Sequence, residues 1–349
     1  MNTYHLVHSD TLSCEAIVRQ VPNGELLMTA QCKGPIEPHP DNRVFYWHSK
    51  DGGKSWDTPT KLWPEDGQAV YQTEVSVIGD RVLVFLTLHD GNFLDWKCVV
   101  AESNDSGYTW EKSSLLPYFS EFTFFRGMIE CTDHTLIQPY QRYPVTAETN
   151  RFLKMQNKKI WDGWEQIPWN ENGVIRSEDG GKTWQHYPVS RLPHNRKIWH
   201  WGEPTVCELE EGHLVMLLRV NGNGCLWRSD SHDGGRHWTK AVQTDIPNPN
   251  NKSKLLRLLD GRIALLHTPA GIKSEKSKLW PLNMSDRNPL EIWISSDNMK
   301  TWEYKEKILD FPGAISYPDG FSSSDGRRIH LSIEFNRHDI YYIIHEIET

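Results

Sequence analysis

The sequence predicts an all-β protein, a six-bladed β-propeller, on the strength of two repeated signals. The first is an octapeptide of the form S-x-D-x-G-x-x-W, which occurs at residues 49–56, 103–110, 177–184, 231–238 and, with Met at the Gly position, 295–302. The second is a turn followed by an apolar strand, which occurs at residues 22–28, 79–85, 133–137, 211–217, 260–266 and 325–331. A period that runs through the whole chain is typical of a repeat architecture. We therefore treat residues 1–349 as a single propeller domain.

Each octapeptide has the residues of a tight β-turn. The Asp carboxylate can accept nearby backbone N–H groups, the Gly permits a positive φ, and the Trp can fold back over the hairpin. In the last copy Met299 replaces the Gly, so we expect that turn to be built differently or to carry strain. Ring symmetry would spread five identical groups around the rim. We therefore interpret these turns as structural and expect the function at the funnel on the propeller axis.

The repeat length predicts how the ring closes. Repeats of roughly 50 to 80 residues hold four strands of ordinary length with their turns. The last repeat ends after the apolar segment at residues 340–347 and is one strand short. We expect the segment around residues 4–7 to supply that strand, which would protect the sheet edges. The longest stretch between repeats, residues 141–174, is expected to be an insertion over one face, and it contains Trp161, Trp164 and Trp169.

Composition narrows the class of partner. The net charge of -8 at pH 7 disfavours nucleic acids and anionic membranes. Residues 1–8 do not resemble a signal peptide and no apolar run is long enough to span a membrane, so we expect a cytoplasmic protein. The six cysteines form no CxxC pair and are expected to be reduced. No cluster has the spacing of metal ligands, so no metal or cofactor is expected. The sequence leaves the oligomeric state open.

The octapeptides resemble the Asp boxes of sialidases (neuraminidases), and residues 203–337 follow the order of functional residues in that family. Glu203 precedes a Gly turn and a strand that ends at Arg219, Arg287 comes shortly before the last octapeptide, and Tyr317 follows it. The resemblance implies that the two arginines bind the substrate carboxylate. It also implies that Tyr317 is the nucleophile and that Glu203 takes its proton.

This set of residues is chemically consistent. An arginine presents a planar fork that matches a carboxylate with two charge-assisted hydrogen bonds. A phenol, with a pKa of about 10, is a poor nucleophile unless a base lies beside it, and Glu203 could be that base. The resemblance therefore implies a sialidase-like glycosidase that releases a terminal acidic sugar, such as sialic acid, from an acidic oligosaccharide.

The first repeat departs from the family pattern. Sialidases carry an Arg-Ile-Pro motif there, whereas residues 13–18 read Ser-Cys-Glu-Ala-Ile-Val, and Arg19 lies out of register. The family's acid/base Asp lies on the loop before the first Asp box, where Glu37 and Asp41 are both candidates and His39 is a third. The remaining candidates for substrate binding are Arg126, Arg337, Asn250 and His200.

Two other functions stay open. The chain is also similar to propeller lyases and hydrolases that act on uronic-acid oligosaccharides, such as rhamnose-glucuronate linkages, in which a Tyr or His abstracts a proton. Candidate histidines are His39, His89 and His200. A carbohydrate-binding propeller without catalysis is the third possibility. Tryptophans that could stack on sugar rings are Trp199, Trp201 and Trp280. The discriminating observation is whether Glu203, Arg219, Arg287 and Tyr317 converge.

Overall fold

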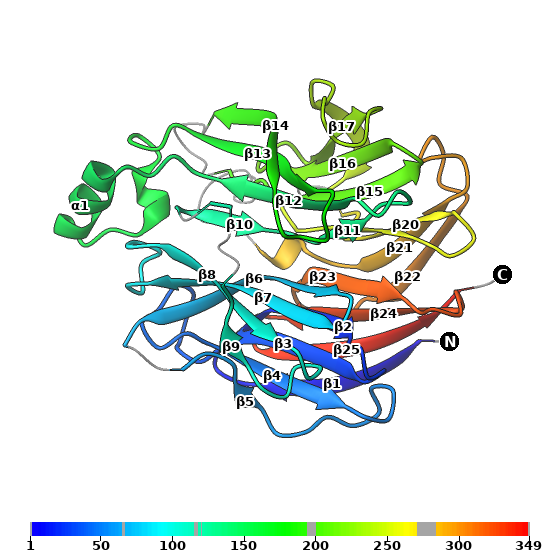
Figure 1. Ribbon diagram of the computed structural model, residues 1–349, viewed down its shortest axis with the longest axis horizontal. Coiled ribbons are helices and arrows are strands. Elements are labelled where there is room, and N and C mark those ends of the chain that lie inside the picture. The colour runs from blue at the N-terminus through cyan, green and yellow to red at the C-terminus, as the bar shows by residue number, and fades with distance from the viewer. Residues whose placement is uncertain are drawn as a thin grey trace.

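Six antiparallel sheets form the β-propeller that the repeats predict (Figure 1). A computed structural model of the protein describes residues 2–64, 67–114, 118–119, 121–193, 200–270 and 284–347. In blades 1 to 5 the order of the strands from the axis to the rim follows their order in the chain. The first strand of each blade therefore lies at the axis, where first strands of neighbouring blades contact one another. This arrangement brings the same position of each repeat to the centre of the ring.

The strands have the following bounds. Blade 1 consists of β2 (Ser13–Gln20), β3 (Leu26–Cys32), β4 (Arg43–Ser49) and β5 (Thr60–Lys61). Blade 2 consists of β6 (Ala69–Ile78), β7 (Arg81–His89), β8 (Lys97–Ser103) and β9 (Glu111–Lys112). In blade 3 the inner strand is split into β10 (Thr123–Phe125) and β11 (Ile129–Glu130), followed by β12 (Leu136–Arg142), β13 (Trp169–Ser177) and β14 (Gln185–Pro193).

The second half of the ring repeats this plan. Blade 4 consists of β15 (Pro204–Glu210), β16 (His213–Arg219), β17 (Cys225–Ser231) and β18 (Val242–Pro247). Blade 5 consists of β19 (Lys254–Arg257), β20 (Ile263–His267), β21 (Leu290–Ser295) and β22 (Tyr304–Leu309), with the short helix η3 (Met284–Asp286) before β21. Blade 6 contains β23 (Ile315–Ser322), β24 (Arg328–Phe335) and β25 (Asp339–Glu346).

The N-terminal strand completes blade 6, as predicted. β1 (Thr3–Ser9) pairs antiparallel with β25, so that Thr3 lies opposite Ile344 and Ser9 opposite Asp339. Both ends of the chain therefore lie on the same side of the molecule (Figure 1). Closure of the ring by the two ends leaves β1 as an outer strand and covers the edge of β25.

The octapeptide turns have the predicted hydrogen bonds. In the first copy the Asp51 carboxylate accepts the Ser55 N–H at 2.9 Å, and the Gly53 N–H donates to the Ser49 hydroxyl at 2.8 Å. The last copy keeps the same bonds, since the Met299 N–H donates to the Ser295 hydroxyl at 2.9 Å. Met299 holds a φ of 64° there, so this turn is built like the others and places a non-Gly residue in a strained region.

The stretch between β12 and β13 carries the expected insertion. It folds as the helix α1 (Ala147–Met155), whose first turn is capped by the Thr146 hydroxyl, and the 3₁₀ helix η1 (Ile160–Gly163). α1 projects from the ring (Figure 1). Leu153 and Ile160 bury their side chains against Phe122 and Tyr143, which fixes the insertion on blade 3.

The cores between blades are apolar, and they contain Cys32, Cys131 and Cys207. All six cysteines are free, as the sequence predicted, and only Cys225 is partly exposed. Within the described residues, no helix has both the length and the apolar character needed to cross a membrane.

Candidate active site

The inner strands of all six blades bring polar side chains to one end of the propeller axis. Five of these side chains line a cavity of about 430 Å³, and the ammonium group of Lys252 lies 5.4 Å from the ring centroid of one of them, Tyr317. In chain order the six residues are Glu15 on β2, Tyr71 on β6, Arg126 just after β10, Glu203 just before β15, Lys252 just before β19 and Tyr317 on β23.

Two of these residues are aimed by irregularities in their strands. The register of β2 shifts between Cys14 and Ile17, and the register of β23 shifts between Ser316 and Asp319. At these shifts Glu15 has a φ of 51° and Tyr317 a φ of 54°. An extra residue in one strand redirects its side chain, and strained backbone of this kind concentrates at functional sites. The propeller therefore turns both side chains into the cavity by the same device.

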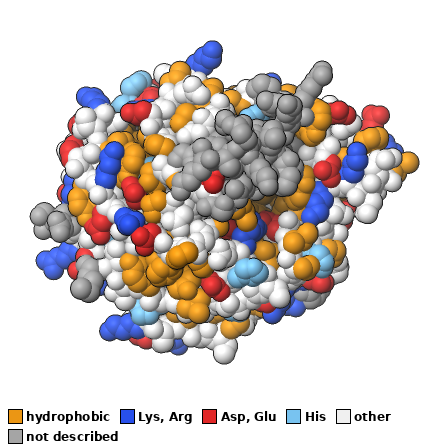
Figure 2. All heavy atoms as spheres, turned by 180° about the vertical axis from the view of Figure 1, so that it is seen from behind, with side chains coloured by type: hydrophobic (Ala, Val, Ile, Leu, Met, Phe, Trp, Pro, Cys, Tyr) orange, Lys and Arg blue, Asp and Glu red, His pale blue; other side chains and the backbone are white. Residues whose placement is uncertain are grey.

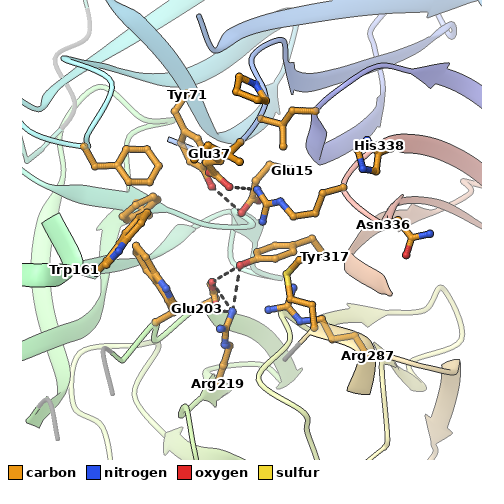
Figure 3. Close-up of a pocket in the computed structure, with 18 of the residues that line it drawn as sticks. Glu15, Glu37, Tyr71, Trp161, Glu203, Arg219, Arg287, Tyr317, Asn336 and His338 are labelled. Atoms are coloured by element: carbon orange, nitrogen blue, oxygen red, sulfur yellow. Dashed lines mark hydrogen bonds and ion pairs between the residues drawn. The ribbon is translucent and has the colours of Figure 1, made fainter. Parts of the chain in front are cut away.

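Tyr317, Glu203 and Arg219 form one hydrogen-bonded cluster on a wall of the cavity (Figure 3). The Tyr317 hydroxyl donates to Oε1 of Glu203 at 3.0 Å. Nη1 of Arg219 donates to both Glu203 oxygens, at 3.0 and 2.8 Å, and to the Tyr317 hydroxyl at 3.2 Å. All three side chains are buried. The cluster thus holds a phenol, a carboxylate and a guanidinium group within hydrogen-bonding distance of one another.

Arg287 lies beside this cluster. Its guanidinium group is 5.4 Å from the ring centroid of Tyr317, and it donates to the Ser316 hydroxyl at 3.1 Å and the Asn250 carbonyl at 2.8 Å. Its Nε is buried and has no hydrogen-bond partner among the described residues. Burial and the negative charge of Glu203 raise the pKa of Tyr317, and they outweigh Arg219 and Arg287, which lower it. The phenol is therefore held in its protonated form.

A second phenol and carboxylate face the first cluster across the cavity (Figure 3). The Tyr71 hydroxyl donates to Oε1 of Glu15 at 2.7 Å, while Arg126 and Lys252 contact Oε2 at 3.2 and 3.3 Å. Burial alone would raise the pKa of Glu15, but Lys252, Arg126 and the Tyr71 hydrogen bond together lower it. Glu15 is therefore held as a buried carboxylate.

The cavity mouth carries a third carboxylate and guanidinium pair. Arg337 forms an ion pair with Glu37, and both residues line the cavity. Behind them Glu334 accepts the Glu15 N–H at 2.8 Å and lies 3.9 Å from Arg337. Burial and then the charge of Glu15 raise the pKa of Glu334 to about 8. Glu334 is therefore largely protonated at neutral pH, whereas Glu15 beside it is charged.

The structure brings seven of the predicted site residues to the cavity: Tyr317, Glu203, Arg219, Arg287, Arg126, Arg337 and the acid candidate Glu37. The other acid candidate, Asp41, does not line it, and 71% of its side chain is exposed, beside His39. Asn250 is buried beneath the cavity, where its carbonyl orients Arg287 and its side chain accepts the Gly222 N–H at 2.7 Å.

The predicted histidines lie outside the cavity lining. His200 is buried, its carbonyl accepts the Tyr143 hydroxyl at 3.0 Å, and burial lowers its pKa to about 4. His89 is fully buried and accepts the Gly91 N–H at 3.0 Å, and burial lowers its pKa to about 3. Of the predicted tryptophans, Trp201 lines the cavity, whereas Trp199 and Trp280 lie outside the described residues.

Sequence reasoning missed Glu15 and Tyr71 as site residues, and it did not place Trp161 at the cavity. Glu15 and Tyr71 are polar residues within otherwise buried inner strands. A buried charge that interrupts such a strand needs a partner, and this was the signal that could have marked Glu15. Among the described residues, no group of three or more His, Cys, Asp or Glu could hold a metal ion.

Comparisons with known proteins agree with the repeats. The model of the BNR repeat-like domain family matches residues 24–331. The chain belongs to this family. No curated protein matches the sequence.

Solved structures share the fold at low sequence identity. The Hadza microbial sialidase Hz136 has a TM-score of 0.73 and 16% identity, over 99% of this chain and 68% of that one. A protein of unknown function from Dyadobacter fermentans has a TM-score of 0.70 and 18% identity, over 99% and 98%. Trypanosoma rangeli sialidase, in complex with 2,3-difluorosialic acid as a covalent intermediate, has a TM-score of 0.68 and 14% identity, over 98% and 59%. These likenesses show the six-bladed architecture.

Proposed function

We propose that this BNR repeat-like protein is a glycoside hydrolase that releases a terminal acidic sugar, with Tyr317 as the nucleophile. The observation that carries the proposal is the hydrogen bond from the Tyr317 hydroxyl to Glu203, 3.0 Å long, beside two buried arginines. A nucleophile within hydrogen-bond reach of a base that a third group orients is the arrangement expected for covalent catalysis.

Each residue has a separate part in the proposed reaction. Arg219 and Arg287 bind the carboxylate of the sugar, for which Arg287 still has an Nε–H without a partner among the described residues. The Tyr317 oxygen attacks the anomeric carbon while its proton passes to Glu203. The glycosidic bond breaks, and the leaving oxygen takes a proton from Glu37. A water molecule, which gives a proton back to Glu37, then cleaves the bond between the sugar and Tyr317, and the phenol recovers its proton from Glu203.

The lining of the cavity supports Glu37 over Asp41 as the acid. Glu37 lines the cavity, whereas Asp41 lies on the exposed loop next to it. Because Arg337 pairs with Glu37, this ion pair must break before the carboxyl group can deliver a proton. We therefore expect substrate entry to displace Arg337 from Glu37.

The proposal is tested with a panel of sialosides and uronosides. Released sugar and the ultraviolet absorbance of a new C=C bond are followed in the same samples. Release of a saturated acidic sugar, together with trapping of a glycosyl group on Tyr317 by a fluorinated sugar, supports the proposal. An absorbing unsaturated product indicates β-elimination on a uronate instead, and binding without turnover indicates a carbohydrate-binding propeller.

A further inference from the structure

Glu15 is built into the cavity in the same way as the proposed nucleophile. Both residues lie at a register shift of an inner strand and both have a left-handed φ, 51° for Glu15 and 54° for Tyr317. β2 and β23 belong to adjacent blades and contact each other. A strained backbone persists only where the surrounding structure holds it in place. The conformation of Glu15 therefore needs an explanation in the cavity that it faces.

The contacts of Glu15 divide the positive charge of the site into two parts. Its Oε2 pairs with Arg126 at 3.2 Å and with Lys252 at 3.3 Å, and both cations are buried. Arg219 is paired with Glu203, and Arg287 has no carboxylate within ion-pairing distance among the described residues. The region around Arg287 can therefore attract an anion, while the opposite wall already holds its own.

We infer that Glu15 is a specificity-determining residue, which restricts the site to sugars with one anionic group. The inference rests on the proposed function and deepens it. Glu15 acts as a built-in anion on the wall opposite Arg219 and Arg287. Together with Asp319, which lies 3.8 Å from Lys252, it offsets the cations that would hold a second carboxylate, sulfate or phosphate. A sugar acid with its carboxylate on Arg287 then turns its neutral, hydroxylated side toward Glu15.

The Glu15 carboxylate also suits a hydroxyl partner. Oε1 accepts one hydrogen bond, from Tyr71 at 2.7 Å, and a carboxylate oxygen can accept two. A sugar hydroxyl can occupy the remaining site, whereas an anionic group would meet a like charge in a cavity of low dielectric constant. Tyr71 keeps the carboxylate in place without changing its charge.

The test compares binding of two probes by calorimetry. One probe is methyl glucuronide and the other is the same compound with one sulfate ester. We expect the native protein to bind the sulfated probe at least about tenfold more weakly, because the added charge meets Glu15. Glu15→Gln removes that charge and leaves Arg126 without an ion-pair partner among the described residues and Lys252 with Asp319 alone, so the preference should shift toward the sulfated probe by at least about tenfold.

A second variant should shift the preference between the two probes in the opposite direction. Arg126→Gln leaves the charge of Glu15 less neutralised, so discrimination against the sulfated probe should become stronger. A purely structural role of the pair would move both variants in the same direction. Glu111→Gln, an exposed change on β9, is the matched control and should leave the ratio unchanged. Thermal unfolding of each variant shows whether it is folded before binding is compared.

The outcomes separate this inference from the proposed function. If Glu15→Gln and Arg126→Gln leave the ratio of the two affinities unchanged, or if the native protein binds neither probe, the inference is wrong. Turnover of the panel of sialosides and uronosides is measured separately on the same preparations. Shifted ratios without turnover would reject the hydrolase and keep the specificity role, whereas turnover with constant ratios would do the reverse.

Discussion

Replacing Tyr317 by Phe is the sharpest perturbation of the proposed mechanism. The change removes one oxygen, which donates to Glu203 at 3.0 Å and accepts from Arg219 at 3.2 Å. If this oxygen forms the bond to the sugar, we expect turnover to fall at least about a thousandfold, equivalent to about 4 kcal/mol of activation free energy.

The same change should affect stability only slightly. Glu203 keeps its contact with Arg219 at 2.8 Å, so no buried charge loses its partner. The Phe ring would still lie beside Arg287 and Lys252, each 5.4 Å from the ring centroid in the native protein. Loss of one hydrogen bond to a charged group then costs about 1–2 kcal/mol of unfolding free energy.

Tyr140→Phe is a matched control. The Tyr140 hydroxyl also donates to a buried carboxylate at 3.0 Å, that of Glu171, and this carboxylate likewise keeps arginine partners, Arg142 and Arg191. We expect a similar loss of stability and unchanged turnover. Turnover is measured with the substrate identified in the panel, and stability by denaturant unfolding. If Tyr317→Phe and Tyr140→Phe have the same turnover, the nucleophile assignment is refuted.

Two further predictions concern the frame around the site. Gly52 and Gly53 both have positive φ values, 72° and 90°, but an added Cβ would meet nothing at Gly52 and would lie 1.9 Å from the Tyr342 ring at Gly53. In denaturant unfolding, Gly52→Ala should therefore cost about 1 kcal/mol and Gly53→Ala several-fold more, and equal costs would contradict this packing. The pKa of Glu334 is about 8 in the folded protein, whereas in the unfolded chain it has its ordinary value of 4.5. As the pH rises from 4.5 to 8, the free energy of unfolding of the native protein should therefore decrease relative to that of Glu334→Gln, by at most about 1.4 kcal/mol per pH unit. Parallel curves of stability against pH for the two proteins would refute the assignment.

The architecture could be predicted from the sequence because it depends on local, repeated chemistry. The Asp carboxylate of each octapeptide bonds to backbone groups within its own turn, so the motif reports the turn wherever it occurs. The strand missing from blade 6 followed from the count of repeats, and β1 fills that place. The number and spacing of the repeats therefore predicted the fold, which a single short motif could not have done.

The site was only partly predictable, because its contacts join residues from different blades. Tyr317 and Glu203 came from a resemblance in the order of residues, and they meet across 114 positions of the chain. Glu15 contacts Lys252, which is 237 positions away in the chain. It reaches the cavity through a strand bulge that could not be predicted from the sequence. The sequence shows that residues 13–18 contain no arginine. It does not show the proposed role of Glu15, which depends on the left-handed φ of this residue and on cations from blades 3 and 5.

The pairing of β1 with β25 also limits when this protein can acquire its final form. Thr3 and Ile344 face each other, so β1 is synthesised well before its partner β25 and cannot pair until β25 has been made. Until then five blades can assemble, but only the outer strand of the sixth, β1, has been made, and the funnel lacks Tyr317. Synthesis therefore delivers the proposed nucleophile and β25, the partner of β1, within the same stretch of chain, and the site assembles only as the ring closes.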